Sequence, residues 1–253
     1  MWAARDLFYF LVWRDIKVRY AQTALGAFWT LFQPLGMMLV FTYAFARLAD
    51  IDTGTVPYPV FALSGLALWL FISRAVMLGA SSLVSNVPLV TKTSCPRIVI
   101  VLASIVPPLL DFVISISLFL LVAGLYGIFP SWKFVLVPPI LLLAFLLALG
   151  LSLFLAALNV RYRDVGQALP FIVQLWFFLS PVAYTLHTPG LSWATIVQAV
   201  NPLVGMIGVL RWALVDEPAP RGLLLVSVVA TFLLLVGSIV YFVRAERTLA
   251  DDA

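Results

Sequence analysis

Long stretches without a charged residue divide the chain into segments that can each cross a membrane. They cover residues 20–46, 53–73, 98–132, 134–160, 165–210 and 222–243, and the only Asp, Glu, Lys, Arg or His residues in them are Asp111 and His187. About 20 apolar residues cross a hydrocarbon core of about 30 Å. Because lipid offers the backbone no hydrogen-bond partner and the runs lack barrel-strand alternation, we expect α-helices. The pattern predicts six spans, at residues 26–48, 58–79, 98–127, 134–158, 167–186 and 222–243.

Residues 5–22, ahead of the first span, mix aromatic and charged side chains. One stripe recurs at spacings of 4, 3 and 4 residues, namely Tyr9, Trp13, Ile16 and Tyr20. Polar side chains occupy the opposite face, where Asp15 precedes Arg19 by one helical turn. The pattern predicts an amphipathic helix lying in the cytoplasmic membrane surface. An extension of the first span is the alternative.

A second irregular region lies between the fifth and sixth spans. Asn201 and Pro202 suit a helix cap and first turn, but the apolar run at residues 203–214 is too short to cross a membrane. We expect two short helices within residues 192–215 that form a re-entrant hairpin in the outer leaflet, at 192–199 and 202–215. A further pair of spans is the alternative.

The composition supports the same fold class. Hydrophobic residues make up 64% of the 253 residues and charged residues 10%, whereas soluble domains carry about 25% charged residues. The mean hydropathy is +1.12. The chain is therefore predicted to be an all-α polytopic membrane protein, with residues 1–253 forming one transmembrane domain. Its basic residues are scattered, which argues against nucleic-acid binding despite a net charge of +4.

The distribution of Lys and Arg predicts the orientation. Six spans place both termini on one side, and that side holds ten of the 15 Lys and Arg residues, against four on the other side. By the positive-inside rule, both termini are expected to be cytoplasmic. The first residues show no small-residue cleavage site after an apolar core, so we expect no removable signal peptide.

Catalytic motifs are missing from the sequence. No lysine follows a glycine, so the chain has no P-loop, and it has neither a His-Glu-x-x-His motif nor a nucleophile elbow. Cys95 and His187 are each the only residue of their type, which is too few for a disulfide or a histidine metal site. We expect a non-catalytic chain with no metal and no cofactor of its own.

Two ionisable residues fall inside predicted spans, Arg74 and Asp111. Each costs about 2.5 to 3.5 kcal/mol at the centre of a membrane helix, so each should face protein or water, and the two can pair with one another. An ion-coupled secondary transporter is the alternative function. Such a transporter usually has more carboxylates in its spans, or broken helices at matching positions of two repeated halves, and this sequence shows no internal repeat. A non-transporting scaffold subunit is a third reading.

Several short segments carry a family resemblance. They are Arg14–Tyr20, Leu25–Trp29 with Gln33–Leu35, Asn86–Val90 with Lys92 and Cys95–Arg97, Asn159–Asp164, Phe178–Tyr184 and Asn201–Leu203. In this order across nearly the whole chain, they resemble the membrane subunit of polysaccharide ABC exporters of the O-antigen and teichoic-acid type. Cys95 departs from that family, which commonly has an aromatic residue there.

The resemblance implies a homodimer in the bacterial inner membrane that works with two copies of a separate P-loop ATPase. That ATPase would bind ATP and Mg²⁺, and the whole transporter would export a glycan linked to undecaprenyl diphosphate. Export of a small lipid or a drug by a related ABC transporter is the alternative.

The resemblance also implies roles for individual residues. Residues 82–97 would form the coupling loop that seats in the ATPase. The residues expected at this interface are Arg14, Asp15, Lys17, Arg19, Asn86, Pro88, Lys92, Pro96, Arg97, Arg161, Arg163 and Asp164. The alternative is that each of these charged residues only helps to set the orientation of the chain in the membrane.

Aromatic rings can stack on the apolar faces of sugars and so line a glycan path. The channel candidates are Phe28, Trp29, Phe32, Trp176, Phe177 and Tyr184, and the alternative for them is lipid contact or packing. Asn201 and Pro202 are expected to form an outer gate.

Overall fold

The computed structural model describes residues 2–21, 28–48, 53–87, 89, 96–185, 198, 200–220 and 222–248. Every regular element within these residues is helical. The helices are α1 (Trp2–Ala21), α2 (Phe28–Phe41) continued by the π-helix η1 (Thr42–Leu48), α3 (Tyr58–Ser85), α5 (Arg97–Ser104), α6 (Pro108–Leu125), the 3-10 helix η2 (Trp132–Leu136), α7 (Val137–Arg161), α8 (Asp164–Leu179), α10 (Pro202–Val215) and α11 (Leu223–Thr248).

Five segments in the described ranges are long and apolar enough to cross a membrane, at Thr30–Leu48, Tyr58–Ser85, Arg97–Leu125, Trp132–Arg161 and Leu223–Glu246. The predicted fifth span, 167–186, corresponds to α8, which has 16 residues and so a length of roughly 24 Å. Helix α8 ends at Leu179 because Ser180 is extended and precedes a proline, and that position disfavours helical backbone.

The predicted span 98–127 is two helices rather than one. Helix α5 ends at Ser104 and α6 begins at Pro108, with a bend over Ile105–Pro107. Two adjacent prolines, Pro107 and Pro108, lack the backbone N–H that would continue the helical hydrogen bonds across this point. The bend lets α5 lie against both α1 and α3.

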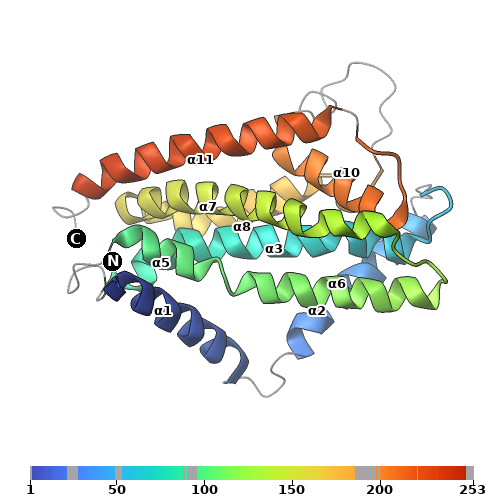
Figure 1. The fold of residues 1–253 in the computed structure, drawn as a ribbon, viewed down its shortest axis with the longest axis horizontal. Helices are drawn as coiled ribbons and strands as arrows, with labels where there is room; N and C mark the ends of the chain where they lie inside the picture. The colour runs from blue at the N-terminus through green and yellow to red at the C-terminus, as the bar shows by residue number, and fades with distance from the viewer. Residues whose placement is uncertain are drawn as a thin grey trace.

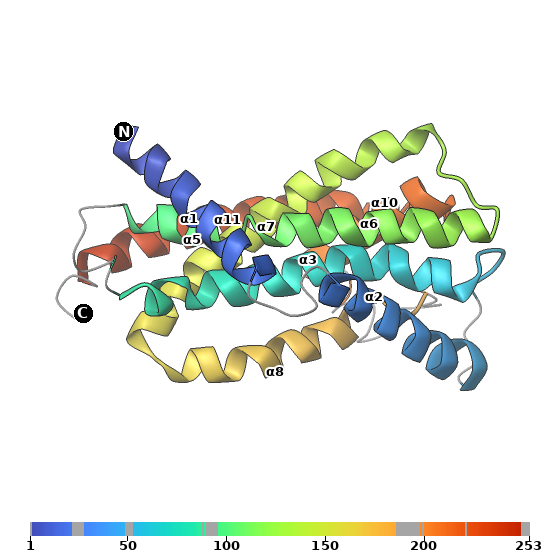
Figure 2. The ribbon, with the colours of Figure 1, turned by 90° about the horizontal axis from the view of Figure 1, so that it is seen from below.

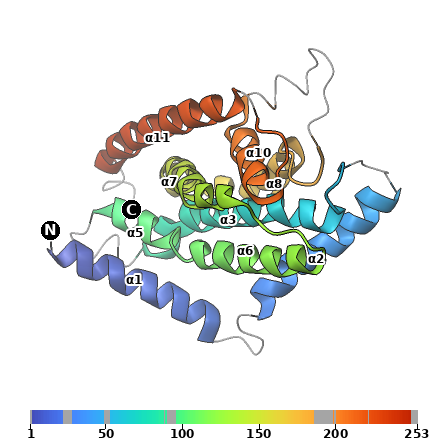
Figure 3. The same ribbon diagram turned by 45° about the vertical axis from the view of Figure 1, so that its right-hand side comes forward.

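Helix α3 forms the centre of the bundle. Of its 28 residues, 21 are buried, and it contacts α2, α5, α6, α7, α8 and α10. Helices α11 and α1 lie on opposite sides of it (Figures 1 and 3). Helix α1 runs obliquely against the outside of the bundle (Figure 2), and its placement at the membrane surface stays a prediction.

Helix α11 reverses the usual pattern of an amphipathic helix. Its buried positions are Ser227, Thr231, Ser238 and Phe242, while Leu225 and Leu233 are 67% and 70% exposed. Small polar residues face the neighbouring helices and large apolar residues face outward, which is the arrangement that suits a lipid solvent.

The beginning of α1 and the end of α11 lie at the same end of the bundle (Figure 1). The end of α3, the start of α5 and the turn between α7 and α8 gather there as well. We call the end of the bundle where α1 begins and α11 ends the terminal end. Residues 53–57, 126–131 and 216–220 lie at the opposite end.

Candidate functional site

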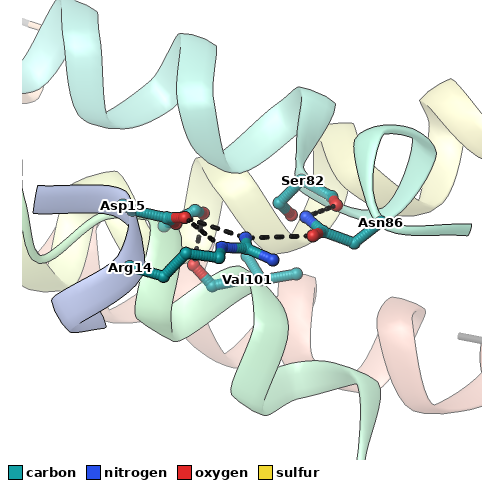
Figure 4. Close-up of polar contacts among 6 residues, drawn as sticks. Arg14, Asp15, Ser82, Asn86 and Val101 are labelled. Atoms are coloured by element: carbon teal, nitrogen blue, oxygen red, sulfur yellow. Dashed lines mark hydrogen bonds and ion pairs between the residues drawn. The ribbon is translucent and has the colours of Figure 1, made fainter. Parts of the chain in front are cut away.

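The interfacial helix is tied to the start of the predicted coupling loop. The guanidinium of Arg14 donates from Nε to the Asp15 carboxylate at 2.8 Å and from Nη2 to Oδ1 of Asn86 at 3.0 Å. Asn86 follows the last residue of α3, and its amide donates to the carbonyl of Ser82 at 2.8 Å. Figure 4 shows these side chains converging between α1 and α3. This hydrogen bond connects the end of α3 to α1.

A buried carboxylate joins α1 to the spans. Asp111 on α6 is 2% exposed, and its Oδ2 lies 2.6 Å from Nη2 of Arg19 and 3.1 Å from Nη1 of Arg74. Arg74 also donates to the side-chain oxygen of Gln33 on α2. The sequence left the pairing of Arg74 with Asp111 open as one of two possibilities, and the structure shows it. The contributions of Arg19 and Gln33 become visible only in the structure. The network links α1, α2, α3 and α6.

The other predicted coupling residues occupy the terminal end without meeting in one cluster. Arg97, at the start of α5, donates to the backbone carbonyl of Glu246 on α11 at 3.4 Å, and Pro96 precedes it as the helix cap. The side chains that are largely exposed are those of Lys17, Arg161, Arg163 and Asp164. Pro88 and Lys92 lie outside the described residues.

The predicted channel aromatics have different surroundings. Phe32 on α2 is 53% exposed, whereas Phe177 on α8 is only 7% exposed. The Phe177 ring packs against Trp69 and Phe41, with centroids 5.3 and 5.4 Å apart. Phe32 thus faces outward, while Phe177 packs inside the helix bundle. The side chains of Phe28 and Trp29 lie outside the described part of the structure.

The predicted gate residue Asn201 connects α10 to the end of α8. Its Oδ1 accepts from the backbone N–H of Leu203 and from the ring N–H of Trp176, each at 3.1 Å. Its amide donates to the Ser180 hydroxyl at 2.8 Å and to the Leu179 carbonyl at 3.3 Å. Pro202 occupies the first turn of α10. One channel candidate, Trp176, and one gate candidate, Asn201, therefore belong to the same hydrogen-bond group.

Replacing Asn201 with alanine is expected to lower the free energy of unfolding by about 2 kcal/mol, because it removes a helix cap and leaves buried donors without an acceptor. Hydrogen exchange should become faster over the first turn of α10. Ser131→Ala, which removes the cap of the short helix η2, is the control and should cost less than about 1 kcal/mol. Equal effects of the two variants would contradict this role.

Arg211 on α10 is one of the four Lys and Arg residues that the predicted topology places on the outer side, and no other role was predicted for it. It is 3% exposed and donates to the carbonyl of Val182 at 2.7 Å and to that of Tyr184 at 3.4 Å. Its guanidinium lies 3.6 Å from the centre of the Phe61 ring. Tyr184 in turn donates from its hydroxyl to the Phe178 carbonyl at 3.0 Å. Arg211 thus holds the turn after α8 against α10 and α3. The sequence feature that could have indicated this role is a single charged residue on a short apolar helix.

No three His, Cys, Asp or Glu side chains gather into a group that could hold a metal ion in the part of the chain that the structure describes. The polar groups described above are arginines, carboxylates, amides and hydroxyls that bind one another and the backbone. Such an arrangement connects helices.

Comparison with known proteins places this arrangement in a family. Residues 6–215 match the family described as "ABC-2 type transporter". The chain is 32% identical over 246 residues to the "O-antigen export system permease protein RfbA" of Myxococcus xanthus, covering 96% of this chain and 94% of that protein. It is 27% identical to the protein of the same name from Klebsiella pneumoniae, over 82% and 78% of the two chains. Its identity to the "Polysialic acid transport protein KpsM" of Escherichia coli is 22%, over 94% and 93%.

These relatives are named as permease and transport proteins, and the matched region runs from the interfacial helix α1 to the end of α10. The chain therefore belongs to the ABC-2 type transporter family, as a polytopic membrane protein homologous to polysaccharide export permeases.

Proposed function

We propose that this chain is the membrane subunit of an ATP-driven exporter that moves a lipid-linked, O-antigen-like glycan across the bacterial inner membrane. The observation that carries the proposal is the 32% identity to an O-antigen export permease over 96% of this chain. In this proposal the chain forms a homodimer, both termini are cytoplasmic, and two copies of a separate P-loop ATPase bind ATP and Mg²⁺.

The contacts at the terminal end support a mechanical coupling. Residues 87–95 connect Asn86, at the end of α3, to the start of α5 at Pro96 and Arg97. A push by the ATPase on this connection would act on two helices directly. It would also act on α1 through the bond between Arg14 and Asn86.

The surroundings of Asp111 argue against the ion-coupled alternative. Asp111 is held between two guanidiniums in a site that is 2% exposed, and charged residues inside spans commonly pair with one another. We therefore assign Asp111 to a structural ion pair that joins helices.

The outward-facing aromatic side chains of α2 and α8 support a path at the dimer interface. Phe32, Phe171 and Phe178 are 53%, 64% and 59% exposed. Exposed rings stack on sugar faces without holding one unit tightly, so a polymer could slide between two such surfaces.

The proposal predicts that the purified chain has no ATPase activity, and that it copurifies with a P-loop ATPase encoded beside it. Glycan export in cells should fall at least tenfold when the P-loop lysine of that ATPase is replaced. The matched control is a conservative replacement on the surface of the ATPase. Export that continues at full rate with the inactive ATPase would refute the proposal, as would export by the chain alone in liposomes.

A further inference from the structure

A cavity of about 660 Å³ lies between α1, the second half of α3 and the bend after α5. It follows α3 from Arg74 to Asn86, which is roughly three helical turns. It lies beside α1, the helix that runs obliquely on the outside of the bundle (Figure 2). A molecule in this cavity would lie at the level of the membrane surface on that side.

The cavity carries an excess of positive charge. Arg14, Arg19 and Arg74 line it, and the carboxylates paired with them are Asp15 and Asp111. Three guanidiniums against two carboxylates leave a formal excess of one positive charge. The side chains of Arg14, Arg19 and Arg74 are 35%, 23% and 30% exposed, so this charge is only partly solvated.

The rest of the wall combines serine side chains and Asn86 with an apolar part. Val18 on α1 and Met77 and Leu78 on α3 line the cavity, and they are 52%, 38% and 42% exposed. A purely soluble anion would gain nothing from these side chains. A molecule with a charged head and a hydrocarbon tail would contact both parts of the wall.

We infer that this cavity binds the headgroup of an anionic glycerophospholipid, with the phosphate near the arginines and the acyl chains along Val18, Met77 and Leu78. One phosphodiester carries one negative charge, which matches the excess of one positive charge. Arginine suits phosphate because its planar fork donates two parallel hydrogen bonds. The bound lipid would hold α1 against α3 and so keep the interfacial helix at the membrane surface.

The test is direct lipid binding to the full chain in detergent micelles, measured by native mass spectrometry with phosphatidylglycerol and phosphatidylcholine. Ser81 lines the cavity, and its hydroxyl bonds only to carbonyls of its own helix turn, at Met77 and Leu78. Ser81→Glu places a carboxylate in the wall and should weaken phosphatidylglycerol binding about tenfold, while Ser81→Gln, of the same size, should not. Phosphatidylcholine should bind weakly to all three proteins.

A second pair of variants distinguishes lipid binding in the cavity from a general attraction of the lipid to the positive charge of α1. Arg14→Gln should weaken phosphatidylglycerol binding about fivefold. Lys17→Gln removes the same charge from an exposed position of the same helix and should change it less than twofold. Equal effects of Ser81→Glu and Ser81→Gln, or of Arg14→Gln and Lys17→Gln, would overturn the inference.

Two further ligands distinguish the source of the phosphate. Inorganic diphosphate at millimolar concentration should not displace phosphatidylglycerol, because it cannot use the apolar wall. If it did displace the lipid, or if undecaprenyl diphosphate bound more than tenfold tighter in the same cavity, the assignment to a bulk phospholipid would be wrong. None of these measurements depends on export, so their outcome is independent of the proposed function.

Discussion

Asp111→Asn is expected to lower the free energy of unfolding by about 3 kcal/mol. The asparagine keeps the shape of the side chain but removes the negative charge that pairs with Arg19 and Arg74. Losing one partner of a buried ion pair costs about 3 to 5 kcal/mol. We take the lower limit because the two arginine side chains are 23% and 30% exposed and can partly turn toward water. Unfolding by denaturant in detergent micelles would measure the loss.

The matched control for this variant is Asp15→Asn. Asp15 also pairs with an arginine, but its side chain is 30% exposed and that of Arg14 is 35% exposed. Solvent screens such a pair, so the control should cost less than about 1 kcal/mol. A loss of stability in Asp111→Asn no greater than that of the control would show that the buried network does not stabilise the fold.

Asp111→Asn should also change the behaviour of α1. Arg19 reaches from the interfacial helix to Asp111 on α6, so losing that ion pair should speed hydrogen exchange along α1 more than along α7. Uniform acceleration in both helices would mean that the variant lowers global stability without releasing α1 in particular.

Gly79→Ala is expected to cost about 2 kcal/mol at the contact between α3 and α7. A Cβ at Gly79 would lie 2.2 Å from Oγ and 2.4 Å from Cβ of Ser152, and 3.0 Å from Cγ2 of Ile105. Rotating the Ser152 hydroxyl cannot relieve the clash with its own Cβ, so the two helices must move apart. Overpacking of this kind typically costs about 1 to 3 kcal/mol. Thermal unfolding of the purified variant would measure it.

Two further variants test the cause of this loss. Gly237→Ala is the control, because a Cβ there meets nothing within 4 Å, and alanine in an open helical position should be neutral or stabilising by up to about 1 kcal/mol. Adding Ser152→Gly to Gly79→Ala removes the clashing atoms and should restore most of the stability. If the double variant were less stable than Gly79→Ala alone, the contact with Ser152 would not be the cause.

The sequence was enough to predict the fold class and the family. The prediction of an all-α polytopic membrane protein and the resemblance to polysaccharide export permeases are both confirmed. Lipid imposes a strong and local rule, since an uncharged run of about 20 residues must form internal hydrogen bonds. The sequence also showed that Arg74 and Asp111 could pair, because charged residues inside spans commonly pair with one another, but it left open whether Arg74 instead reaches the membrane surface.

Some local details differ from the predictions although the sequence contains their cause. The break between α5 and α6 follows from Pro107 and Pro108, and the end of α8 follows from Pro181 after Ser180. Hydropathy does not reveal such breaks. Proline changes the hydrogen bonding of the backbone, but it changes the average polarity of an apolar segment very little.

The tertiary structure alone decided which distant residues meet. Arg19 pairs with a residue of α6, Gln33 joins the same network from α2, and Trp176 bonds to Asn201. Each of these contacts depends on how far a helix is rotated and where it crosses its neighbours. Crossings of that kind are set by packing among all the helices, as at Gly79 against Ser152, and no local pattern of hydrophobic and polar residues encodes them.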